Sequence, residues 1–540
     1  MADSKKKGAK QANVTVPKLV GITVPKETNC GQWYVEVVQK AELVEYYSEI
    51  SGFYILRPPA MHIWSTLKKF FQSKIEDMGV QEASFPMFLS ATSLAKVRGT
   101  TTCFDDAAEA DASEHVEGFA PELAWVTKAG DKDLEVPVAV RPTSEAVMYP
   151  YYAKWIRSHR DLPLRLNQWN SVVRWEAKQT TPFLRAREFL WQEGHTAHLT
   201  EELASKEVLE ILELYAAIFE KLLAVPVVRG KKTEAEKFAG ASWTSTVEAF
   251  VPANGRGIQG ATSHALGQNF SKMFGITVED PDKKGSHINV WQNSWGLSTR
   301  VIGVMIMVHG DDKGLVLPPK VANIQTVIIP VGLNAKTKPE DKDKHMEQIQ
   351  ELKATLQKAG VRVQVDDRDG YTPGFKFSDW EMRGVPLRLE FGLRDAAASV
   401  VVTSRRDNGE KGTIPLAELA TEVPALLEKI QDDMYTKAAT TFESRRLKLT
   451  EWDRVVPALD SRNVVIIPFC EEIKCEDRIK ELTRSEDQED ENGRKMPGMG
   501  MKSLCIPFAQ PDGLVAGETK CLNPECQGLA KSWTMFGRSY

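Results

Sequence analysis

The sequence predicts an α+β protein of several domains, and three observations support this fold class. The 540 residues exceed the roughly 250–300 residues at which a single hydrophobic core stops growing. In the first half, two strand-like runs meet at Asn254-Gly255, a dipeptide typical of antiparallel hairpins. In the second half, a strand, a helix and a strand follow one another between residues 327 and 365. This order predicts a small α/β domain with a mixed sheet.

The composition excludes several classes of protein. Hydrophobic residues make up 42% of the chain and charged residues 26%, as in ordinary globular proteins and unlike disordered or fibrous ones. The longest apolar run, Val301–Val308, is far shorter than the roughly 18 residues of a membrane span. The first 20 residues are polar and lysine-rich, unlike a secretory signal. Seven cysteines are too few for a disulfide scaffold. We therefore expect no membrane contact and a reducing, cytoplasmic location.

The charge pattern is nearly balanced, with one basic segment. The net charge of −5 excludes a surface that is basic throughout, but it is compatible with a local basic surface for nucleic acid. Residues 1–18 carry five lysines against one acidic residue, without periodicity. This pattern indicates a solvated tail, and a segment that contacts RNA is the alternative.

Regular elements follow along the first 316 residues. Apolar residues spaced by three and four predict an amphipathic helix over residues 60–78, which ends at Gly79. A polar, acidic loop is expected at 100–125. Thr200 is expected to cap a helix, and Ser298 or Thr299 to cap a buried apolar helix over Arg300–Val308. Strands are expected at Val80–Phe85, Val136–Arg141, Ser171–Glu176, Arg187–Ala197, Thr244–Pro252 and Arg256–His264.

The pattern changes at Leu317-Pro318-Pro319, which indicates a domain boundary. A charged helix is expected over Pro339–Lys358, because Pro suits the first helical turn and Gly360 follows its end. A second helix is expected near Leu416–Tyr435. The tail after about residue 440 holds five of the seven cysteines. Strands are expected at Val327–Val331, Val361–Val365, Val385–Phe391, Ser399–Ser404 and Val464–Phe469.

Residues 255–260 match the dinucleotide-binding pattern G-x-G-x-x-G, but their context argues against that function. The pattern binds a pyrophosphate only where it leaves a strand and opens a helix. Here the glycines lie in the predicted hairpin, and the chain after them predicts a strand. A dinucleotide-binding, zinc-dependent oxidoreductase would depend on this match alone. The chain has no G-x-x-x-x-G-K-[ST] motif, so side chains would have to hold any ATP.

Three segments point to a site for anions. They are Arg141-Pro142-Thr143-Ser144-Glu145, the stretch from Val173-Arg174-Trp175-Glu176 to Phe189, and Trp295–Arg300. Arg300 would lie in the first turn of a helix, where a cation opposes the helix dipole. An anionic ligand nearby would explain this arginine, and a rim arginine paired with a carboxylate is the alternative.

These segments resemble the three motifs of class II aminoacyl-tRNA synthetases. The helix that ends at Gly79 and the strand that ends in Pro86 resemble the first motif. Residues 174–189 resemble the second, and residues 296–303 the third. Residues 310–319, 384–388 and 536–540 are similar to prolyl-tRNA synthetases of the eukaryotic and archaeal type. The resemblance covers residues 30 to 540.

The resemblance implies a fold, a reaction and partners. A lysine-rich tail (1–29) would precede a catalytic domain with an antiparallel sheet (30–316), an α/β anticodon-binding domain (317–434) and a small α/β, zinc-containing C-terminal domain (435–540). The protein would activate proline with ATP to prolyl-adenylate and transfer it to the 3′ end of tRNA(Pro), with Mg²⁺ on the phosphates. It would form a homodimer through the first motif. The roughly 100 residues between Phe189 and Trp295 leave no room for a bacterial-type editing insertion of about 150 residues.

The resemblance also implies site residues. Adenylate formation brings a carboxylate against an anionic phosphate, and planar arginine forks can neutralise both. The catalytic residues would be Arg174 and Arg300. The ATP site would comprise Arg174, Glu176, Arg185, Phe189, Gln259, Thr262, Ser298 and Arg300. The proline site would comprise Thr143, Glu145, Arg174, Trp191, His195, Phe238 and His264. Without the resemblance, His195 and His198 would be an ordinary structural pair.

Two pairs of late cysteines predict a structural Zn²⁺ site. Cys470-x4-Cys475 and Cys521-x4-Cys526 offer four thiolates, with buried free thiols as the alternative. In the family the second pair is commonly closer together, so its ligand geometry stays open. Cys505 is expected in a core strand. Candidates for RNA contact in the anticodon-binding domain are Lys376, Arg388, Glu390 and Arg394, with solvated surface charges as the alternative.

Two relatives with other functions fit less well. A threonine enzyme of the same fold would need a cysteine ligand in its active site, and none lies between Cys103 and Cys470. A non-catalytic, tRNA-binding paralogue could dispense with Arg174, Glu176 or Arg300, and all three are present.

Overall fold

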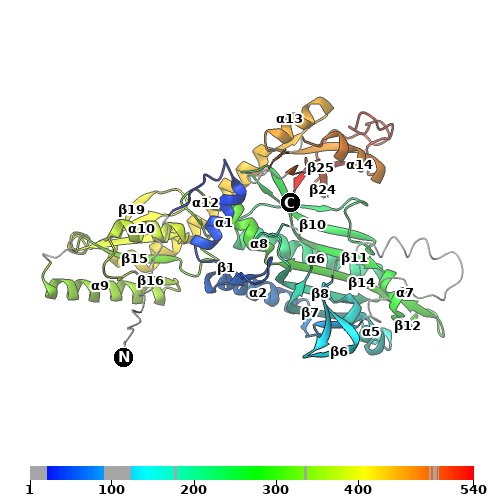
Figure 1. Ribbon diagram of the computed structural model, residues 1–540, viewed down its shortest axis with the longest axis horizontal. Coiled ribbons are helices and arrows are strands. Elements are labelled where there is room, and N and C mark those ends of the chain that lie inside the picture. Colours follow the sequence, from blue (N-terminus) through cyan, green and yellow to red (C-terminus); the bar gives the residue numbers. More distant parts are fainter. Residues whose placement is uncertain are drawn as a thin grey trace, which may run out of the picture.

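The computed structural model describes residues 21–90, 123–175, 179–333, 337–485, 488–489, 495–496 and 498–540. The expected tail at 1–18 and all but the last residues of the expected loop at 100–125 lie outside these ranges. Figure 1 shows two main bodies: a large one built on a long sheet, and a smaller one that carries β15 to β19. Helix α12 (Leu419–Arg445) leads from the smaller body to the C-terminal strands.

The large body is organised around one eleven-stranded sheet in the order β20-β21-β25-β24-β9-β10-β11-β14-β8-β7-β3. Neighbours along its central part are antiparallel, as expected. The C-terminal strands extend this sheet, because β24 pairs with β9. The strands are β3 (Gln81–Glu82), β7 (Leu164–Val173), β8 (Glu188–His198), β9 (Val228–Lys231), β10 (Trp243–Val251), β11 (Arg256–Gly267), β14 (Trp291–Ser298), β20 (Arg446–Lys448), β21 (Val464–Phe469), β24 (Lys502–Pro507) and β25 (Ser532–Ser539).

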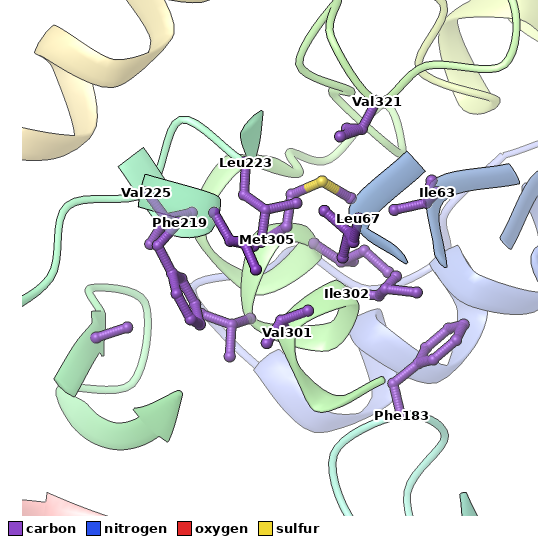
Figure 2. Close-up of a cluster of buried hydrophobic side chains, with 14 of the residues drawn as sticks. Ile63, Leu67, Phe183, Phe219, Leu223, Val225, Val301, Ile302, Met305 and Val321 are labelled. Atoms are coloured by element: carbon purple, nitrogen blue, oxygen red, sulfur yellow. The ribbon is translucent and has the colours of Figure 1, made fainter. Parts of the chain in front are cut away.

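Helix α8 lies at the centre of the main hydrophobic core. Figure 2 shows Val301, Ile302 and Met305 of this helix among side chains from other elements, including Leu67 and Phe219. The predicted apolar helix over Arg300–Val308 is thus confirmed. The helices of this body are α1 (Cys30–Lys40), α2 (Pro58–Asp77), α5 (Glu145–Trp155), α6 (Glu201–Ala217), which continues into a π-helical turn at Ile218–Leu222, α7 (Asn269–Phe274) and α8 (Arg300–His309).

The hairpin at Asn254-Gly255 is confirmed, since β10 and β11 flank it and Gly255 adopts a φ of +70°. The glycines of the G-x-G-x-x-G match therefore belong to a turn and a strand.

Further strands outside the main sheet complete the large body: β1 (Val44–Tyr46), β2 (Tyr54–Leu56), β4 (Phe88–Ser90), β5 (Trp125–Ala129), β6 (Lys132–Val140), β12 (Thr277–Glu279) and β13 (His287–Asn289).

Most predicted strands differ from the structure by a few residues at their ends, and two differ most. The expected strand Val80–Phe85 forms a ladder only at Gln81–Glu82. The expected strand Ser171–Glu176 is the end of the longer β7, which stops at Val173. Arg174 leaves the ladder and turns its side chain toward the carbonyl oxygen of Pro142, 3.2 Å away. Residues that contribute to a site often leave the regular strand geometry. The alternation of apolar and polar residues in the sequence therefore did not locate the ends of these strands.

The smaller body is the α/β domain that the sequence predicts. Its sheet has the order β16-β15-β17-β18-β19 and mixes parallel and antiparallel pairs. The helix expected over Pro339–Lys358 has those bounds. Its elements are β15 (Thr326–Val331), α9 (Pro339–Lys358), β16 (Val363–Val365), α10 (Pro373–Met382), β17 (Leu387–Gly392), α11 (Leu393–Ala397), β18 (Val400–Arg405) and β19 (Lys411–Pro415).

The helix expected near Leu416–Tyr435 continues as α12 to Arg445 and bridges the two bodies. Beyond it lie α13 (Val455–Asp460), β21 and α14 (Ile473–Leu482). Cys505 is fully buried in β24, as expected. Among the described residues, no helix is both long and apolar enough to cross a membrane.

Candidate active site

A cavity of about 370 Å³ opens on one face of the sheet, over strands β8, β11 and β14. Most of the predicted site residues line it, although they come from five separate segments of the chain. They are Thr143, Glu145, Arg174, Phe189, Trp191, His195, Phe238, Gln259, Thr262, His264, Ser298 and Arg300. Arg185 does not line it and is exposed, and Glu176 lies outside the described residues.

The register of three antiparallel strands builds the floor of this cavity. His195 of β8 lies opposite Ser294 of β14, which in turn lies opposite His264 of β11. Two residues further along, Glu193 and Thr262 both lie opposite Gly296. Side chains alternate between the two faces of a strand, so residues two apart share a face. The side chains of Glu193, His195, Thr262 and His264 therefore point into the same cavity. Gly296 keeps the middle of the floor free of a side chain.

A bulge in β11 brings a further predicted residue to the floor. Val247 pairs with Ala261 but Glu248 pairs with Gln259, so Gly260 is the extra residue. An extra residue reverses the alternation of side chains. Gln259, Thr262 and His264 therefore share one face despite their uneven spacing.

Glu193 is the most highly coordinated group of the site, and sequence reasoning missed it. Its carboxylate accepts hydrogen bonds from the backbone and hydroxyl of Ser144, from Gln168 (2.8 Å), from Asn170 (2.9 Å) and from His195 (3.0 Å). Burial would raise the pKa of Glu193, but these donors hold it below its usual value. Strand alternation with Trp191 and His195 is the sequence signal that could have identified it.

His195 is held between an anion and a hydroxyl. Its Nε2 lies 3.0 Å from Glu193 and its Nδ1 lies 3.0 Å from the Tyr149 hydroxyl. Burial lowers the pKa of His195, but the bond to Glu193 and the charge of Glu145 raise it above its usual value overall. The site therefore stabilises an imidazolium at this position.

Glu145 is the second buried carboxylate. It lies in the first turn of α5, is 3% exposed and accepts a hydrogen bond from the Thr143 hydroxyl. Burial, and to a lesser extent Glu193, raise the pKa of Glu145. A ligand cation beside Glu145 would favour its ionised form, so this end of the cavity suits an ammonium group.

His264 provides a neutral wall. It accepts or donates at both nitrogens, to the hydroxyls of Thr244 (2.9 Å) and Thr262 (3.0 Å). Burial, with help from His195, lowers the pKa of His264 to about 3. The ring of Phe238 lies 4.6 Å from it between centroids. With Trp191, these rings form an apolar pocket next to the two carboxylates.

Two arginines occupy the other end of the cavity. The guanidinium of Arg174 lies over the rings of Phe189 (5.5 Å) and Trp191 (5.4 Å). Burial, followed by the charges of Arg174 and Arg185, lowers the pKa of Arg300 to about 10. The backbone N–H of Arg300 donates to the Ser298 hydroxyl (3.3 Å). Guanidinium groups that repel each other in a cavity are stabilised by an anion between them.

Lys232 and Glu236 also line the cavity, and no sequence signal pointed to them. Lys232 is buried and forms an ion pair of 2.7 Å with buried Glu248. Glu236 pairs with Lys502 at 3.1 Å. Both residues lie in the segment between β9 and β10.

The four late cysteines meet in one cluster about the end of β21 and the start of α14. Their sulfur atoms lie within 4.8 Å of one another, and the pairs Cys475–Cys521 and Cys470–Cys526 are 3.7 Å apart. Zn–S bonds of about 2.3 Å in a tetrahedron place sulfur atoms about 3.8 Å apart, so the cluster fits Zn²⁺. Asn523 and the backbone of Gly528 donate to two of the sulfurs, as expected around thiolates.

The candidate RNA contacts in the α/β domain differ in exposure. Lys376 is buried and donates to the backbone oxygen of Asp366 (3.0 Å). Arg388 is buried too, paired with Glu390 (3.0 Å) and stacked on Phe377 at 4.0 Å. Arg394 is exposed. Lys376 and Arg388 thus have protein partners, while Arg394 is open to a ligand.

Three family models match successive parts of the chain. Residues 126–309 match the class II core domain of tRNA synthetases for Gly, His, Pro, Ser and Thr. Residues 325–426 match an anticodon-binding domain. Residues 452–540 match the C-terminal domain of prolyl-tRNA synthetase.

Known proteins are similar over nearly the whole chain. The cytoplasmic proline–tRNA ligase of Arabidopsis thaliana is 50% identical over 538 residues, which are 99% of this chain and 93% of that protein. The bifunctional glutamate/proline–tRNA ligase of Drosophila melanogaster is 52% identical over 538 residues, which are 30% of its length. The crystal structure of prolyl-tRNA synthetase from Cryptosporidium parvum with halofuginone and AMPPNP has a TM-score of 0.87. It is 48% identical, and the match covers 97% of this chain and 100% of that one.

Proposed function

The chain belongs to the prolyl-tRNA synthetase family of class II aminoacyl-tRNA synthetases, and from this premise we propose how its residues act. As a member, it activates proline with ATP and charges tRNA. The observation that supports the assignment of residues is the cavity, in which Glu145, Arg174 and Arg300 meet from three distant segments. One end suits a small cation next to apolar rings, and the other suits anions.

We propose that proline binds at the end formed by Glu145 and His264. Glu145 and Thr143 hold the secondary ammonium, and Trp191, Phe238 and His264 enclose the ring. His195 acts indirectly, because Glu193 fixes its ring and the raised pKa of His195 favours a positive charge beside Glu145.

At the other end, we propose that Arg174 binds both the proline carboxylate and the α-phosphate of ATP. Arg300 and the ring of Phe189 flank the adenine, while Gln259, Thr262 and Ser298 contact the nucleotide. Arg185 reaches the outer phosphates from the exposed rim, and Glu176 contacts the adenine amino group. Mg²⁺, when bound, neutralises charge on the phosphates. Catalysis then consists of positioning and charge stabilisation, without a protein base.

We further propose that the chain is a cytoplasmic homodimer that pairs through α2 and β3, with tRNA(Pro) bound by the α/β domain. Its domains are those expected at 30–316, 317–434 and 435–540, after a tail at 1–29. The relative from Arabidopsis is named cytoplasmic, which supports the location. Zn²⁺ bound by the four-cysteine cluster would stabilise the C-terminal domain.

Replacement of Arg174 and Glu145 tests the two ends separately by proline-dependent pyrophosphate exchange. Arg174→Ala removes the cation shared by both substrates and is expected to cost about 3–4 kcal/mol of transition-state stabilisation. Glu145→Gln is expected to raise the KM for proline more than that for ATP. Arg157→Ala, at an exposed arginine just after α5, is the control and should change neither. Near-normal exchange by folded Arg174→Ala, or equal KM changes in Glu145→Gln, would contradict the assignment.

A further inference from the structure

The segment 232–238 between β9 and β10 forms part of the cavity wall. Lys232, Glu236 and Phe238 line the cavity from this segment. The backbone N–H groups of Glu236 and Lys237 donate to the carbonyl oxygen of Thr233, at 3.2 and 2.9 Å. These bonds close a turn, so a displacement of Thr233 also displaces Phe238.

The C-terminal strand β24 packs directly against this segment. It pairs with β9, with Ile506 opposite Lys231. A Cβ atom at Gly230 would lie 2.5 Å from the backbone oxygen of Ile506, so this close approach requires glycine. Figure 1 shows β24 and β25 next to β10 on the large body.

Three side-chain contacts join β24 to the turn. The Lys232 ammonium donates to the backbone oxygen of Leu504 (2.8 Å). The hydroxyls of Thr233 and Ser503 lie 2.9 Å apart and are buried. Lys502 forms an ion pair of 3.1 Å with Glu236. We call these contacts the β24 clasp.

The clasp also lies next to the cysteine cluster. Buried Glu476 follows Cys475 on α14, and α14 packs against β24. The helix that carries Cys475 thus contacts the strand that carries Ser503, whose hydroxyl lies against Thr233 of the turn.

We propose that the β24 clasp positions Phe238 for proline binding, so that Thr233, Lys502 and Ser503 are positioning residues for the amino acid and not for ATP. This inference rests on the proposed placement of proline against Phe238. Phe238 lies at the proposed proline end: its N–H donates to Thr244 (3.1 Å) and its ring packs on His264. Lys232 is excluded from the test, because it also pairs with Glu248, which lies opposite Gln259.

The test compares the Michaelis constants for proline and for ATP in pyrophosphate exchange. Thr233→Val keeps the shape of the side chain and removes the hydroxyl, while Ser503→Ala removes its partner and Lys502→Met removes the ion pair. Loss of one buried hydrogen bond is expected to raise the KM for proline about five-fold in Thr233→Val, with the KM for ATP unchanged. Thr233→Ser and Lys502→Arg should restore the wild-type value. Lys531→Met is the matched control, since it removes an exposed ion pair with Glu472 in the same domain.

Phe238→Ala, measured in parallel, separates this inference from the proposed pocket. If Phe238→Ala raises the KM for proline and the clasp variants do not, the clasp inference is wrong and the pocket stands. If Phe238→Ala leaves it unchanged, the proposed pocket is wrong. Equal increases for proline and ATP in the clasp variants, or no restoration in Thr233→Ser, would also overturn the inference. Should Thr233→Val not fold, Ser503→Ala and Lys502→Met give the same comparison.

Discussion

The pKa values of two histidines on one floor of the cavity are shifted in opposite directions by their surroundings. His195 faces the carboxylates of Glu193 and Glu145, which raise its pKa against the effect of burial. The two ring nitrogens of His264 face hydroxyls, and burial, with help from His195, lowers its pKa to about 3. The two imidazoles on either side of Ser294 thus differ in how readily they bind a proton. Such a polarised floor can orient a zwitterion with its ammonium toward Glu145.

A histidine outside the site, His309, makes stability depend on pH. His309 ends α8 and donates from Nε2 to the Leu223 oxygen (2.9 Å), while burial lowers its pKa to about 4. Between pH 6.5 and 4 the unfolded chain therefore binds a proton that the folded chain rejects, and stability falls as pH falls. We expect His309→Gln, which can keep the donor, to lose less thermal stability than wild type between pH 7.5 and 5.0.

The comparison uses melting temperatures at both pH values. His287→Gln, at an exposed histidine of β13, is the control and should retain the wild-type slope. An equal pH dependence in wild type and His309→Gln would show that His309 is not responsible.

At the residue scale, sequence reasoning identified side chains that lie on motifs and missed those placed by distant partners. The sequence could have identified Glu193, because it alternates with Trp191 and His195 on one strand. It could not have identified Lys232, because the role of Lys232 depends on Leu504, which is 272 residues away in the chain. The uneven spacing of Gln259 and Thr262 likewise makes sense only with the bulge at Gly260.

At the element scale, apolar periodicity and capping residues predicted long elements well. The helix over Pro339–Lys358 and the strand Val464–Phe469 have the expected bounds. Errors occurred where tertiary contacts end an element, as at Val173, or where they extend one, as in α12. The joining of the C-terminal strands to the catalytic sheet was also not predictable, since strand pairing between remote segments leaves no local signal.

The cysteine cluster lies in the small hydrophobic core where α14 and the loop at 521–526 meet, and we expect these elements to depend on metal. Purified protein should contain about one Zn²⁺ per chain, and Cys521→Ser should lose it. Because metal binding energy in such a site is folding energy, chelation should unfold α14 and the loop at 521–526 before the catalytic core. Hydrogen exchange of these segments, with and without a chelator, measures this order.

Cys505→Ser provides the control for metal content, because Cys505 lies in β24 outside the cluster. It should still bind one Zn²⁺. Zinc-free protein with unchanged thermal stability and unchanged exchange would contradict a structural metal.

At the scale of the whole molecule, an ion pair joins the α/β domain to the chain just after α8. Buried Arg406 binds both carboxylate oxygens of Asp311, with Nη1 2.7 Å from Oδ2. Burial would raise the pKa of Asp311, but Arg406 holds it below its usual value. The backbone oxygen of Asp311 also accepts from Trp33 (3.0 Å). Together with the ion pair of Arg383 with Glu42 (2.9 Å), this contact docks the anticodon-binding body on the catalytic body.

Breaking this pair should loosen the docking of the two bodies without damage to the cavity. We expect Asp311→Asn and Arg406→Gln each to cost about 1–3 kcal/mol in domain docking. Charging of tRNA should then fall while pyrophosphate exchange, which needs the cavity alone, stays near wild type. The double variant should be no worse than either single one, because both remove one contact. Equal losses in pyrophosphate exchange and in tRNA charging would show that the ion pair supports the cavity itself and not only the docking of the two bodies.

The path of the chain between β8 and β14 bears on the fidelity of charging. The residues between these strands are all described, and they form α6, its π-helical turn, β9 to β11, α7 and the β12–β13 pair. These elements build the sheet and its cover, so no separate domain interrupts them. Alanine lacks ring methylenes that proline would place against Trp191 and Phe238. Each missing methylene is worth about 1–3 kcal/mol, so the pocket discriminates against alanine without excluding it. We therefore expect weak alanine-dependent pyrophosphate exchange and no hydrolysis of alanyl-tRNA(Pro). Preformed alanyl-tRNA(Pro), followed with and without the protein, measures this directly, and rapid protein-dependent deacylation would reveal an editing site elsewhere in the chain.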